Sequence, residues 1–198
     1  MALCLGIPWQ YAETDAGYYT RVLGMLAPRN WYNWKYDQFG EPRYLPMLWA
    51  MKAGTHFDTA FAKAKAYPRR TWLLGNEPER SDQSNTDPVE FADCMKQWAA
   101  STGGPSFIVA PGILWSDQGR DWLARYLAVP GRIIPGTWGI HIYGSSTGAG
   151  WQAQMNHAKQ WFLQRGVSRA IWVTETNARG DYNAQVSVMR HIDACVGS

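Results

Sequence analysis

Seven short runs of apolar, β-branched or aromatic residues recur along the 198-residue chain, and segments with helical periodicity separate most of them. The runs are nearly continuously apolar, which is typical of parallel strands that are buried on both faces. They cover residues 2–8, 30–34, 43–49, 71–76, 106–114, 137–143 and 170–175. This alternation of strand and helix predicts an α/β fold built on a parallel sheet.

Capping signals mark the intervening helices. The clearest is Asp87-Pro88-Val89-Glu90, which combines an N-cap residue, a proline at the first helical position and a glutamate placed to close a capping box. The helix that follows to about residue 100 is expected to bury an apolar face of Phe91, Cys94, Met95 and Trp98. Further helices are predicted over residues 15–26, 55–66, 118–128, 150–165 and 181–194.

Two layouts satisfy this alternation, an open doubly wound sheet and a (β/α) barrel. The first strand is followed by Pro8-Trp9-Gln10-Tyr11, where a dinucleotide-binding sheet would carry a glycine fingerprint. No linker or repeat interrupts residues 1–198, so we expect a single domain. The sequence favours a reduced TIM-type (β/α) barrel with seven recognisable strands and the eighth missing after the helix at 181–194. The first and seventh strands should then approach each other or leave an edge open to self-association.

The charge pattern and the hydropathy argue against several classes of partner. Nineteen Lys and Arg residues stand against sixteen Asp and Glu residues, and the longest basic run is Arg69-Arg70, so nucleic-acid binding is not expected. No apolar stretch reaches the roughly 20 residues that span a bilayer, and the start of the chain lacks the pattern of a signal peptide. Three widely spaced cysteines exclude a structural zinc site. Free buried cysteines are favoured, with a Cys4–Cys195 bridge as the alternative.

Tryptophan is unusually abundant, with 12 Trp beside 10 Tyr in the chain. Flat aromatic rings pack well against the C–H faces of sugar rings, and the indole N–H supplies a hydrogen-bond donor. This composition favours a carbohydrate ligand, with packing in the core as the alternative explanation for each tryptophan.

Polar side chains stand at the carboxyl ends of several predicted strands: Asn33, Asn76 with Glu77, His141 with Tyr143, and Glu175 with Asn177. In a barrel these strand ends share one face, so the side chains should converge there. Glu77 and Glu175 each close an apolar strand, where a carboxylate costs desolvation energy unless it has partners and a role. Two carboxylates about 5 to 5.5 Å apart are the arrangement for retaining glycoside hydrolysis. Tyr143 is placed to donate a hydrogen bond that keeps Glu175 ionised.

The chain resembles the clan of (β/α)8-barrel glycoside hydrolases whose acid/base follows an asparagine on the fourth strand and whose nucleophile ends the seventh. Within that clan, five segments in order are similar to glycoside hydrolase family 128, the β-1,3-glucanases. These segments are Trp31-Tyr32-Asn33-Trp34, Leu45-Pro46-Met47-Leu48-Trp49, Leu73-Leu74-Gly75-Asn76-Glu77-Pro78, His141-Ile142-Tyr143 and Ile171-Trp172-Val173-Thr174-Glu175.

The resemblance implies a retaining, endo-acting hydrolase of β-1,3-glucan, with Glu77 as acid/base and Glu175 as nucleophile. Asn76 would donate to the hydroxyl next to the reacting carbon. Substrate contacts are expected from Asn33, Trp34, Trp49, Asn76, Trp115, His141, Tyr143 and Trp151. The implied partner is an oligo- or polysaccharide, no cofactor or metal is needed, and an extracellular location is favoured.

Other functions stay open at this point. The barrel could bind carbohydrate without turnover, if the missing strand has removed catalysis. Gly144-Ser145-Ser146-Thr147-Gly148 matches the nucleophile elbow of serine hydrolases, with Ser146 as nucleophile and Asp181 and His191 following in the expected order. Glu77 or Glu175 could serve only in an ion pair with Arg80 or Arg179. His141 has no second ligand at metal-binding spacing, so a hydrogen-bonding role is favoured for it.

Overall fold

The computed structural model describes residues 4–6, 17–18, 20–21, 24, 30–38 and 40–178. Its strands are β1 (Cys4–Gly6), β2 (Asn30–Tyr32), β3 (Met47–Leu48), β4 (Trp72–Leu74), β5 (Ile108–Leu114), β6 (Thr137–Ser145) and β7 (Ala170–Ala178). The helices between them are α3 (Thr55–Ala66), α4 (Pro88–Ser101), α5 (Asp117–Ala128) and α6 (Gly148–Leu163), with a 3-10 turn η1 (Pro105–Phe107) before β5. The predicted helix at 181–194, the Cys195 thiol and most of the predicted helix at 15–26 lie outside the described residues.

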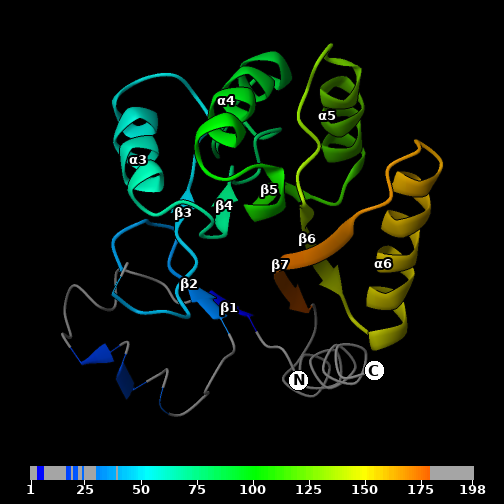
Figure 1. The fold of residues 1–198 in the computed structure, drawn as a ribbon. Coiled ribbons are helices and arrows are strands. Elements are labelled where there is room, and N and C mark those ends of the chain that lie inside the picture. Colours follow the sequence, from blue (N-terminus) through cyan, green and yellow to red (C-terminus); the bar gives the residue numbers. More distant parts are fainter. Residues whose placement is uncertain are drawn as a thin grey trace.

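Every strand pair is parallel, as the apolar runs predicted. Strands β3 to β7 form one five-stranded sheet in chain order, and β1 pairs with β2 in a second sheet. A parallel bridge between Trp31 and Tyr44 links β2 toward β3. On the other side, β1 lies against β7, and the Tyr32 hydroxyl on β2 donates to the Thr174 carbonyl on β7 at 2.8 Å. The described strands therefore enclose a common interior, and β1 and β7 approach each other. Figure 1 shows α3 to α6 following one another around the outside of β3 to β7.

The largest departure from the predicted elements is the strand expected at 43–49, which shrinks to the two residues of β3. Pro46 has no N–H to donate, so it interrupts the ladder between the bridge at Tyr44 and the pairing of β3 with β4. At the other end of the sheet, β6 and β7 run two and three residues past their predicted ends. The longer strands lie on the side of the barrel where helices cover the sheet.

The predicted helix after Asp87 forms as expected. The Asp87 carboxylate accepts a hydrogen bond from the Val89 N–H at 2.8 Å, and Pro88 opens the helix. The apolar face expected for this helix is buried, and the Trp98 ring packs 5.0 Å from that of Trp72 on β4. Cys94 on this face is a free thiol, and burial raises its pKa to about 11.

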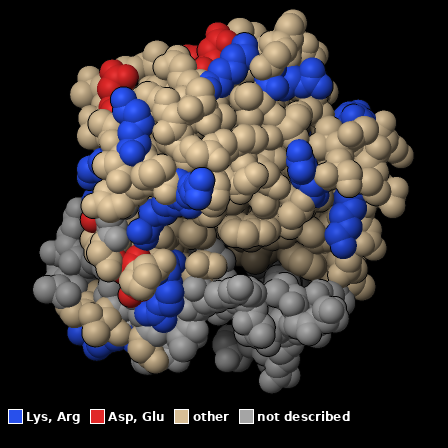
Figure 2. All heavy atoms as spheres, in the orientation of Figure 1, with Lys and Arg blue, Asp and Glu red and all other residues tan. Residues whose placement is uncertain are grey.

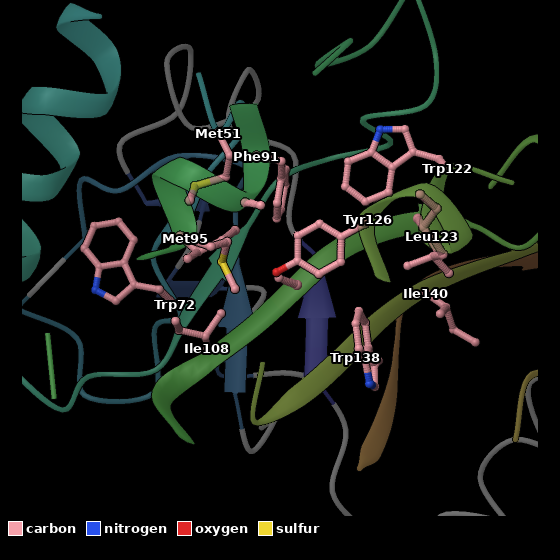
Figure 3. Packing of buried hydrophobic residues seen from close by; sticks show 14 of the residues in the cluster. Met51, Trp72, Phe91, Met95, Ile108, Trp122, Leu123, Tyr126, Trp138 and Ile140 are labelled. Carbon is pink, nitrogen blue, oxygen red and sulfur yellow. The ribbon is translucent and has the colours of Figure 1, made fainter. Parts of the chain in front are cut away.

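The core between sheet and helices holds most of the tryptophans. Figure 3 shows the rings of Trp72, Phe91, Tyr126 and Trp138 filling this layer. The tryptophans that are buried there or beside it are Trp31, Trp72, Trp98, Trp115, Trp122, Trp138, Trp151 and Trp161. Core packing therefore explains more of the tryptophan content than a sugar-binding cleft does.

The surface agrees with the charge pattern of the sequence. On the face drawn in Figure 2, lysines and arginines are spread over the surface, and several of them lie beside aspartates or glutamates. In the part of the chain that the structure describes, no helix is long and apolar enough to cross a membrane. The same residues hold no cluster of His, Cys, Asp and Glu that could bind a metal ion.

Candidate active site

Asn76 and Glu77 lie in the turn after β4. The backbone of this turn hydrogen-bonds first to the β3 side and then to β5. The N–H groups of Gly75 and Asn76 donate to the carbonyls of Leu48 and Trp49 on the β3 side, at 2.8 and 2.9 Å. The Glu77 N–H then donates to the Gly112 carbonyl on β5 at 2.8 Å. Gly75 has a φ of +86°, and a Cβ there would lie 2.7 Å from the Phe91 ring, so the turn needs glycine.

Glu77 itself has a φ of +43°. A residue other than glycine in this region costs about 1–3 kcal/mol and is held there by its surroundings. Its carboxyl group is buried, with Oε1 2.9 Å from Nδ1 of His141 and Oε2 3.3 Å from Nη1 of Arg80. Arg80 also pairs with Asp82 at 2.6 Å. The ion pair between Glu77 and Arg80 that the sequence allowed is therefore present, together with a second contact to His141.

Glu175 lies beside His141 because the register of β6 and β7 pairs these two residues. Its Oε1 accepts a hydrogen bond from Trp34 Nε1 at 2.7 Å, and its Oε2 accepts one from the Tyr143 hydroxyl. Burial, followed by the hydrogen bond and the charge of Glu175, raises the pKa of Tyr143 far above its usual value, so the hydroxyl stays a donor.

Asn76 adds a further donor to Glu175. In the amide orientation that satisfies both neighbours, its nitrogen donates to Glu175 Oε1 at 3.2 Å and its oxygen accepts from Trp49 Nε1 at 3.1 Å. Glu175 therefore faces donors on both oxygens. This is the environment that stabilises an ionised carboxylate.

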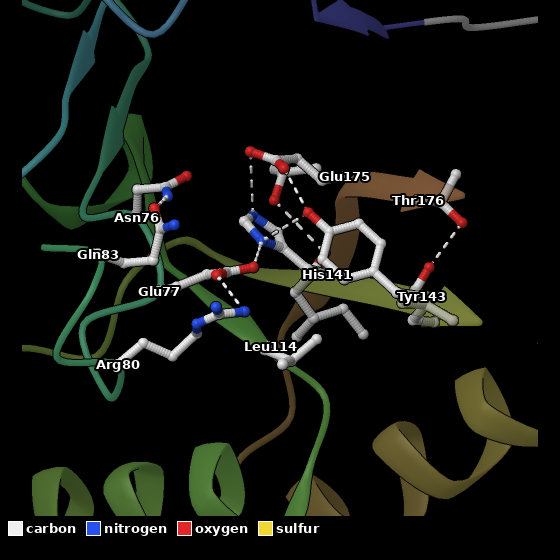
Figure 4. Close-up of polar contacts among 12 residues, drawn as sticks. Asn76, Glu77, Arg80, Gln83, Leu114, His141, Tyr143, Glu175 and Thr176 are labelled. Atoms are coloured by element: carbon white, nitrogen blue, oxygen red, sulfur yellow. Dashed lines mark hydrogen bonds and ion pairs between the residues drawn. The ribbon is translucent and has the colours of Figure 1, made fainter. Parts of the chain in front are cut away.

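His141 lies between the two carboxyl groups, as Figure 4 shows. Besides the contact of Nδ1 with Glu77, its Nε2 lies 3.7 Å from Glu175 Oε1. Gly112 leaves room for the ring, because a Cβ at that position would stand 3.4 Å from His141 Nε2 and 2.7 Å from the Gly75 carbonyl. One imidazole ring thus contacts both glutamates, and the two carboxyl groups flank it.

A cavity of about 370 Å³ opens beside this cluster. Its walls are Trp34, Lys35, Tyr36, Asp37, Met47, Leu48, Trp49, Ala50, His56 and Lys63. Trp34 and Trp49 belong both to this lining and to the hydrogen-bonded group around Glu175. Ligand pockets in proteins span roughly 300–1,000 Å³, so this cavity has the size and the aromatic walls of a binding site.

The structure brings together most of the residues that the sequence placed at the strand ends. Around Glu77 and Glu175 lie Trp34, Trp49, Asn76, His141 and Tyr143.

Asn33 does not join them, which corrects the expectation of a substrate contact. Its side chain is fully buried; Oδ1 accepts from the Tyr44 hydroxyl at 2.6 Å and Nδ2 donates to Asp37 at 3.1 Å. The amide is used inside the loop between β2 and β3.

Trp115 and Trp151 also lie away from the cluster. Trp115 is 7% exposed and packs against Trp161 and Phe162 on α6. Trp151 is 4% exposed within the same core. Position just beyond a strand end suggested the cleft, but both rings turn toward the layer between sheet and helices.

Two neighbours of the site in the loop after β4, Glu79 and Gln83, were not predicted to belong to it, and Arg80 beside them was considered only as an ion-pair partner for a glutamate. Arg80 contacts Glu77, and Gln83 lies 3.1 Å from the Asn76 amide. A signal was available in Asn76-Glu77-Pro78-Glu79, where a second acidic residue follows the first shortly after the end of an apolar strand.

The comparison with protein-family models decides the family. The model named glycosyl hydrolase catalytic core matches residues 21–196. The chain belongs to this family. A comparison with curated proteins gave no match.

Solved structures that are similar to this glycosyl hydrolase catalytic core include enzymes of glycoside hydrolase family 128. An exo-β-1,3-glucanase from Blastomyces gilchristii superposes with a TM-score of 0.75 at 22% identity, covering 98% of this chain and 84% of its own. An endo-β-1,3-glucanase from Amycolatopsis mediterranei gives 0.71 at 20% identity, covering 100% and 83%. An exo-β-1,3-glucanase from Aureobasidium namibiae gives 0.74 at 16% identity, covering 96% and 75%. The resemblance to family 128 is thus confirmed for the fold, which is a TIM-like barrel.

The serine-hydrolase motif occupies a different part of this fold. Ser146 is exposed at the start of α6, and Thr147, the next residue, caps that helix by accepting from the Gly150 N–H at 3.0 Å. Asp181 and His191 lie outside the described residues.

Proposed function

We propose that this glycosyl hydrolase catalytic core cleaves β-1,3-linked glucan by a retaining mechanism, with Glu175 as the nucleophile and Glu77 as the acid/base. The observation that carries the proposal is the pair of carboxyl groups that contact opposite nitrogens of the His141 ring. Glu175 accepts hydrogen bonds on both oxygens from Trp34, Tyr143 and Asn76. Donors to the ionised form keep a carboxylate charged and ready to attack.

Glu77 is suited to move a proton. It is buried across the His141 ring from Glu175, and His141 and Arg80 touch its two oxygens. In the first step the Glu77 carboxyl gives its proton to the glycosidic oxygen while Glu175 Oε attacks the anomeric carbon, so the leaving chain departs as an alcohol and a glycosyl ester forms. In the second step ionised Glu77 removes a proton from water, which displaces Glu175 with a second inversion. Arg80 and His141 stabilise the ionised Glu77 between these steps.

The linkage is supported by the enzymes that share the fold. Structures of the Amycolatopsis enzyme hold laminari-oligosaccharides, in variants that replace one glutamate or another. Those two glutamates are separated along their chain by almost the same number of positions as Glu77 and Glu175. A pair of glutamates at almost the same spacing, in a β-1,3-glucanase with the same fold, supports a β-1,3-glucan substrate here.

Endo action is supported by the cavity beside the glutamates. Trp34 and Trp49 form its wall next to Glu175, and it extends to Tyr36 and Lys63 near α3. A space of about 370 Å³ on one side of the reacting centre can hold more of the glucan chain than the sugar that reacts. Enzymes of the same fold include both endo and exo enzymes, so product length decides this point.

The test is product release from a panel of oligosaccharides of β-1,3-glucan, mixed-linkage glucan, cellulose, mannan and xylan. Native protein is compared with Glu175→Gln and with Glu90→Gln, a control on α4 that changes the same group away from the site. We expect cleavage of β-1,3-linked chains at internal bonds, retention of anomeric configuration by NMR, and loss of activity only in Glu175→Gln. Binding of the same sugars without cleavage by native protein would instead support a carbohydrate-binding barrel.

The acid/base role of Glu77 is tested separately by comparing two substrates with different leaving groups. An aryl glycoside with a good leaving group needs little help from an acid, whereas an unactivated oligosaccharide needs it. Glu77→Ala should therefore lose much more kcat on laminari-oligosaccharide than on the aryl glycoside. Equal losses on the two substrates would contradict the assignment.

A further inference from the structure

Glu79 is a third carboxyl group beside the two glutamates, and the proposed reaction does not use it. It follows Glu77 by two positions in the turn after β4 and is 9% exposed. Its Oε2 is buried and has no hydrogen-bond partner among the described residues. A buried, unpartnered carboxyl oxygen is unfavourable, so its presence next to the site needs a physical reason.

Glu79 joins the turn to the carboxyl end of β5. Its Oε1 accepts a hydrogen bond from the Leu114 N–H at 2.9 Å, and its backbone carbonyl accepts one from Gln118 Nε2 on α5 at 2.7 Å. Two positions earlier on both segments, the Glu77 N–H donates to the Gly112 carbonyl. The Glu79 carboxyl group therefore takes the place of the backbone carbonyl that a longer β4 would offer to β5.

The charge of Glu79 is coupled to that of Glu77. Burial raises the pKa of Glu79 to about 7, and the negative charge of Glu77 adds to the rise, whereas the Leu114 N–H and His141 oppose it. Arg80 is the other charged group that interacts with Glu79. Glu79 is therefore neutral in weakly acidic solution.

We propose that Glu79 is a positioning residue for Glu77: its carboxyl group fastens the turn that bears Glu77 to the end of β5 and keeps the acid/base aimed at the glycosidic oxygen. The inference rests on the proposed role of Glu77. The turn depends on this hydrogen bond because Glu77 has a φ of +43°, a backbone conformation that is unfavourable for a residue with a side chain. If the turn were not held in place, Glu77 would relax out of this conformation. A small displacement of a catalytic group costs much of its effect on the rate.

The first test compares Glu79→Met, which removes the acceptor for Leu114, with Glu79→Gln, which keeps one, and with Glu90→Gln as the control. Each is assayed on laminari-oligosaccharide and on an aryl β-glucoside with a good leaving group. We expect Glu79→Met to lower kcat on the oligosaccharide roughly ten- to a hundredfold at nearly unchanged KM, and to lower it far less on the aryl glucoside. Glu79→Gln, which keeps an acceptor for the Leu114 N–H, should recover most of the activity that Glu79→Met loses, and Glu90→Gln should match the native protein. Equal losses on the two substrates, or no loss, would overturn the inference.

The second test holds even if Glu79→Met does not fold. Glu79→Asp keeps the charge but is one methylene shorter, so its carboxyl group no longer reaches the Leu114 N–H, and kcat on the oligosaccharide should fall more than kcat on the aryl glucoside. Equal losses of Glu79→Asp on the two substrates, or no loss, would overturn the inference. Glu77→Ala measured on the same two substrates separates the two claims: equal losses there would sink the acid/base assignment, whereas equal losses confined to Glu79→Met contradict only the role of Glu79.

Discussion

The two sides of the barrel are built differently. From β4 to β7 the strands are joined by helices, and β5, β6 and β7 run for seven to nine residues. We call this the helical side. From β1 to β3 the strands have two or three residues, and residues 33–38 and 40–46 belong to the loop between β2 and β3. We call this the loop side. The helical side carries Glu77 and Glu175, and the loop side carries Trp34 and Trp49.

The difference separates two tasks. Long paired strands with a packed helical layer fix His141, Tyr143 and Glu175 in one register, which chemistry at a bond requires. The loop side is held by side-chain bonds instead: Arg70 donates to the carbonyls of Glu41 and Tyr44 at 2.9 and 2.8 Å. A loop can shape a cavity for a particular ligand while a rigid scaffold positions it. On this account, substitutions on the helical side change stability and turnover, and substitutions on the loop side change affinity.

The same substitution on each side gives the largest contrast. Trp98→Ala removes a ring that is 1% exposed and packed against Trp72, so it should lower the free energy of unfolding by about 3–5 kcal/mol. Trp49→Ala removes a ring that is 39% exposed and should change stability little, while weakening the binding of laminari-oligosaccharide. Chemical denaturation and calorimetry measure the two effects. Equal destabilisation by both variants would break the comparison.

The next largest effect is on the pH dependence of stability. Because the pKa of Glu79 is raised from 4.5 to about 7, the folded protein retains a proton that the unfolded chain releases over this range. Stability from this group is full below about pH 4.5 and is lost as pH rises through 7, by at most roughly 3 kcal/mol. Glu79→Gln should remove this decline, and Glu90→Gln should leave it. Unfolding midpoints in denaturant between pH 5 and 8 measure this loss of stability. If stability fell equally with pH in Glu79→Gln, the decline would not come from a proton held by Glu79.

Glu175 accepts hydrogen bonds from residues on both the helical side and the loop side. Removing one donor from each side tests whether the two sides affect different kinetic parameters. Tyr143→Phe deletes a hydroxyl held on β6 and should lower kcat roughly 10- to 100-fold, because hydrogen bonds to charged groups contribute about 1.5–3 kcal/mol. Trp34→Phe deletes the indole N–H and alters the cavity wall, so it should raise KM as well as lower kcat. Steady-state kinetics on laminari-oligosaccharides separate the two parameters. If Tyr143→Phe changed only KM, Tyr143 would act in binding rather than in turnover, and the comparison of the two sides would be contradicted.

The smallest effect is expected within the loop itself. The Tyr44 hydroxyl donates to Asn33 Oδ1 at 2.6 Å in a buried site. Tyr44→Phe should cost about 1 kcal/mol of stability, because Asn33 Oδ1 keeps the Lys35 N–H at 3.2 Å as its donor. The affinity for oligosaccharide should fall with it, since Lys35 and Tyr36 line the cavity. Thermal melting and calorimetry test this, and unchanged affinity would argue that the cavity does not depend on the loop network.

Periodicity predicted the helical side well, because β4, β5 and most of β6 are buried on both faces and each helix has an apolar face. It predicted β3 poorly, because the ladder is interrupted at Pro46, whose effect depends on where its neighbours lie. The strand-end rule brought Glu77, His141 and Glu175 together, since parallel strands share one carboxyl end. It failed for Asn33, Trp115 and Trp151, because a position at a strand end does not determine the direction in which a side chain turns. Glu79 was missed because its role depends on the Leu114 N–H. β4 ends before it could offer this N–H a backbone carbonyl, so the Glu79 carboxyl group accepts the hydrogen bond instead.

The central claim is that Glu175 is the nucleophile, and the most direct measurement is to trap its covalent intermediate. A 2-deoxy-2-fluoro laminaribioside with an activated leaving group slows hydrolysis of the glycosyl ester, so the adduct accumulates and can be weighed by intact mass and located by peptide mapping. The account predicts one adduct on Glu175 in native protein and none in Glu175→Gln. An adduct on Glu77 or another carboxylate, or turnover of laminari-oligosaccharide with inversion and no adduct, would contradict it.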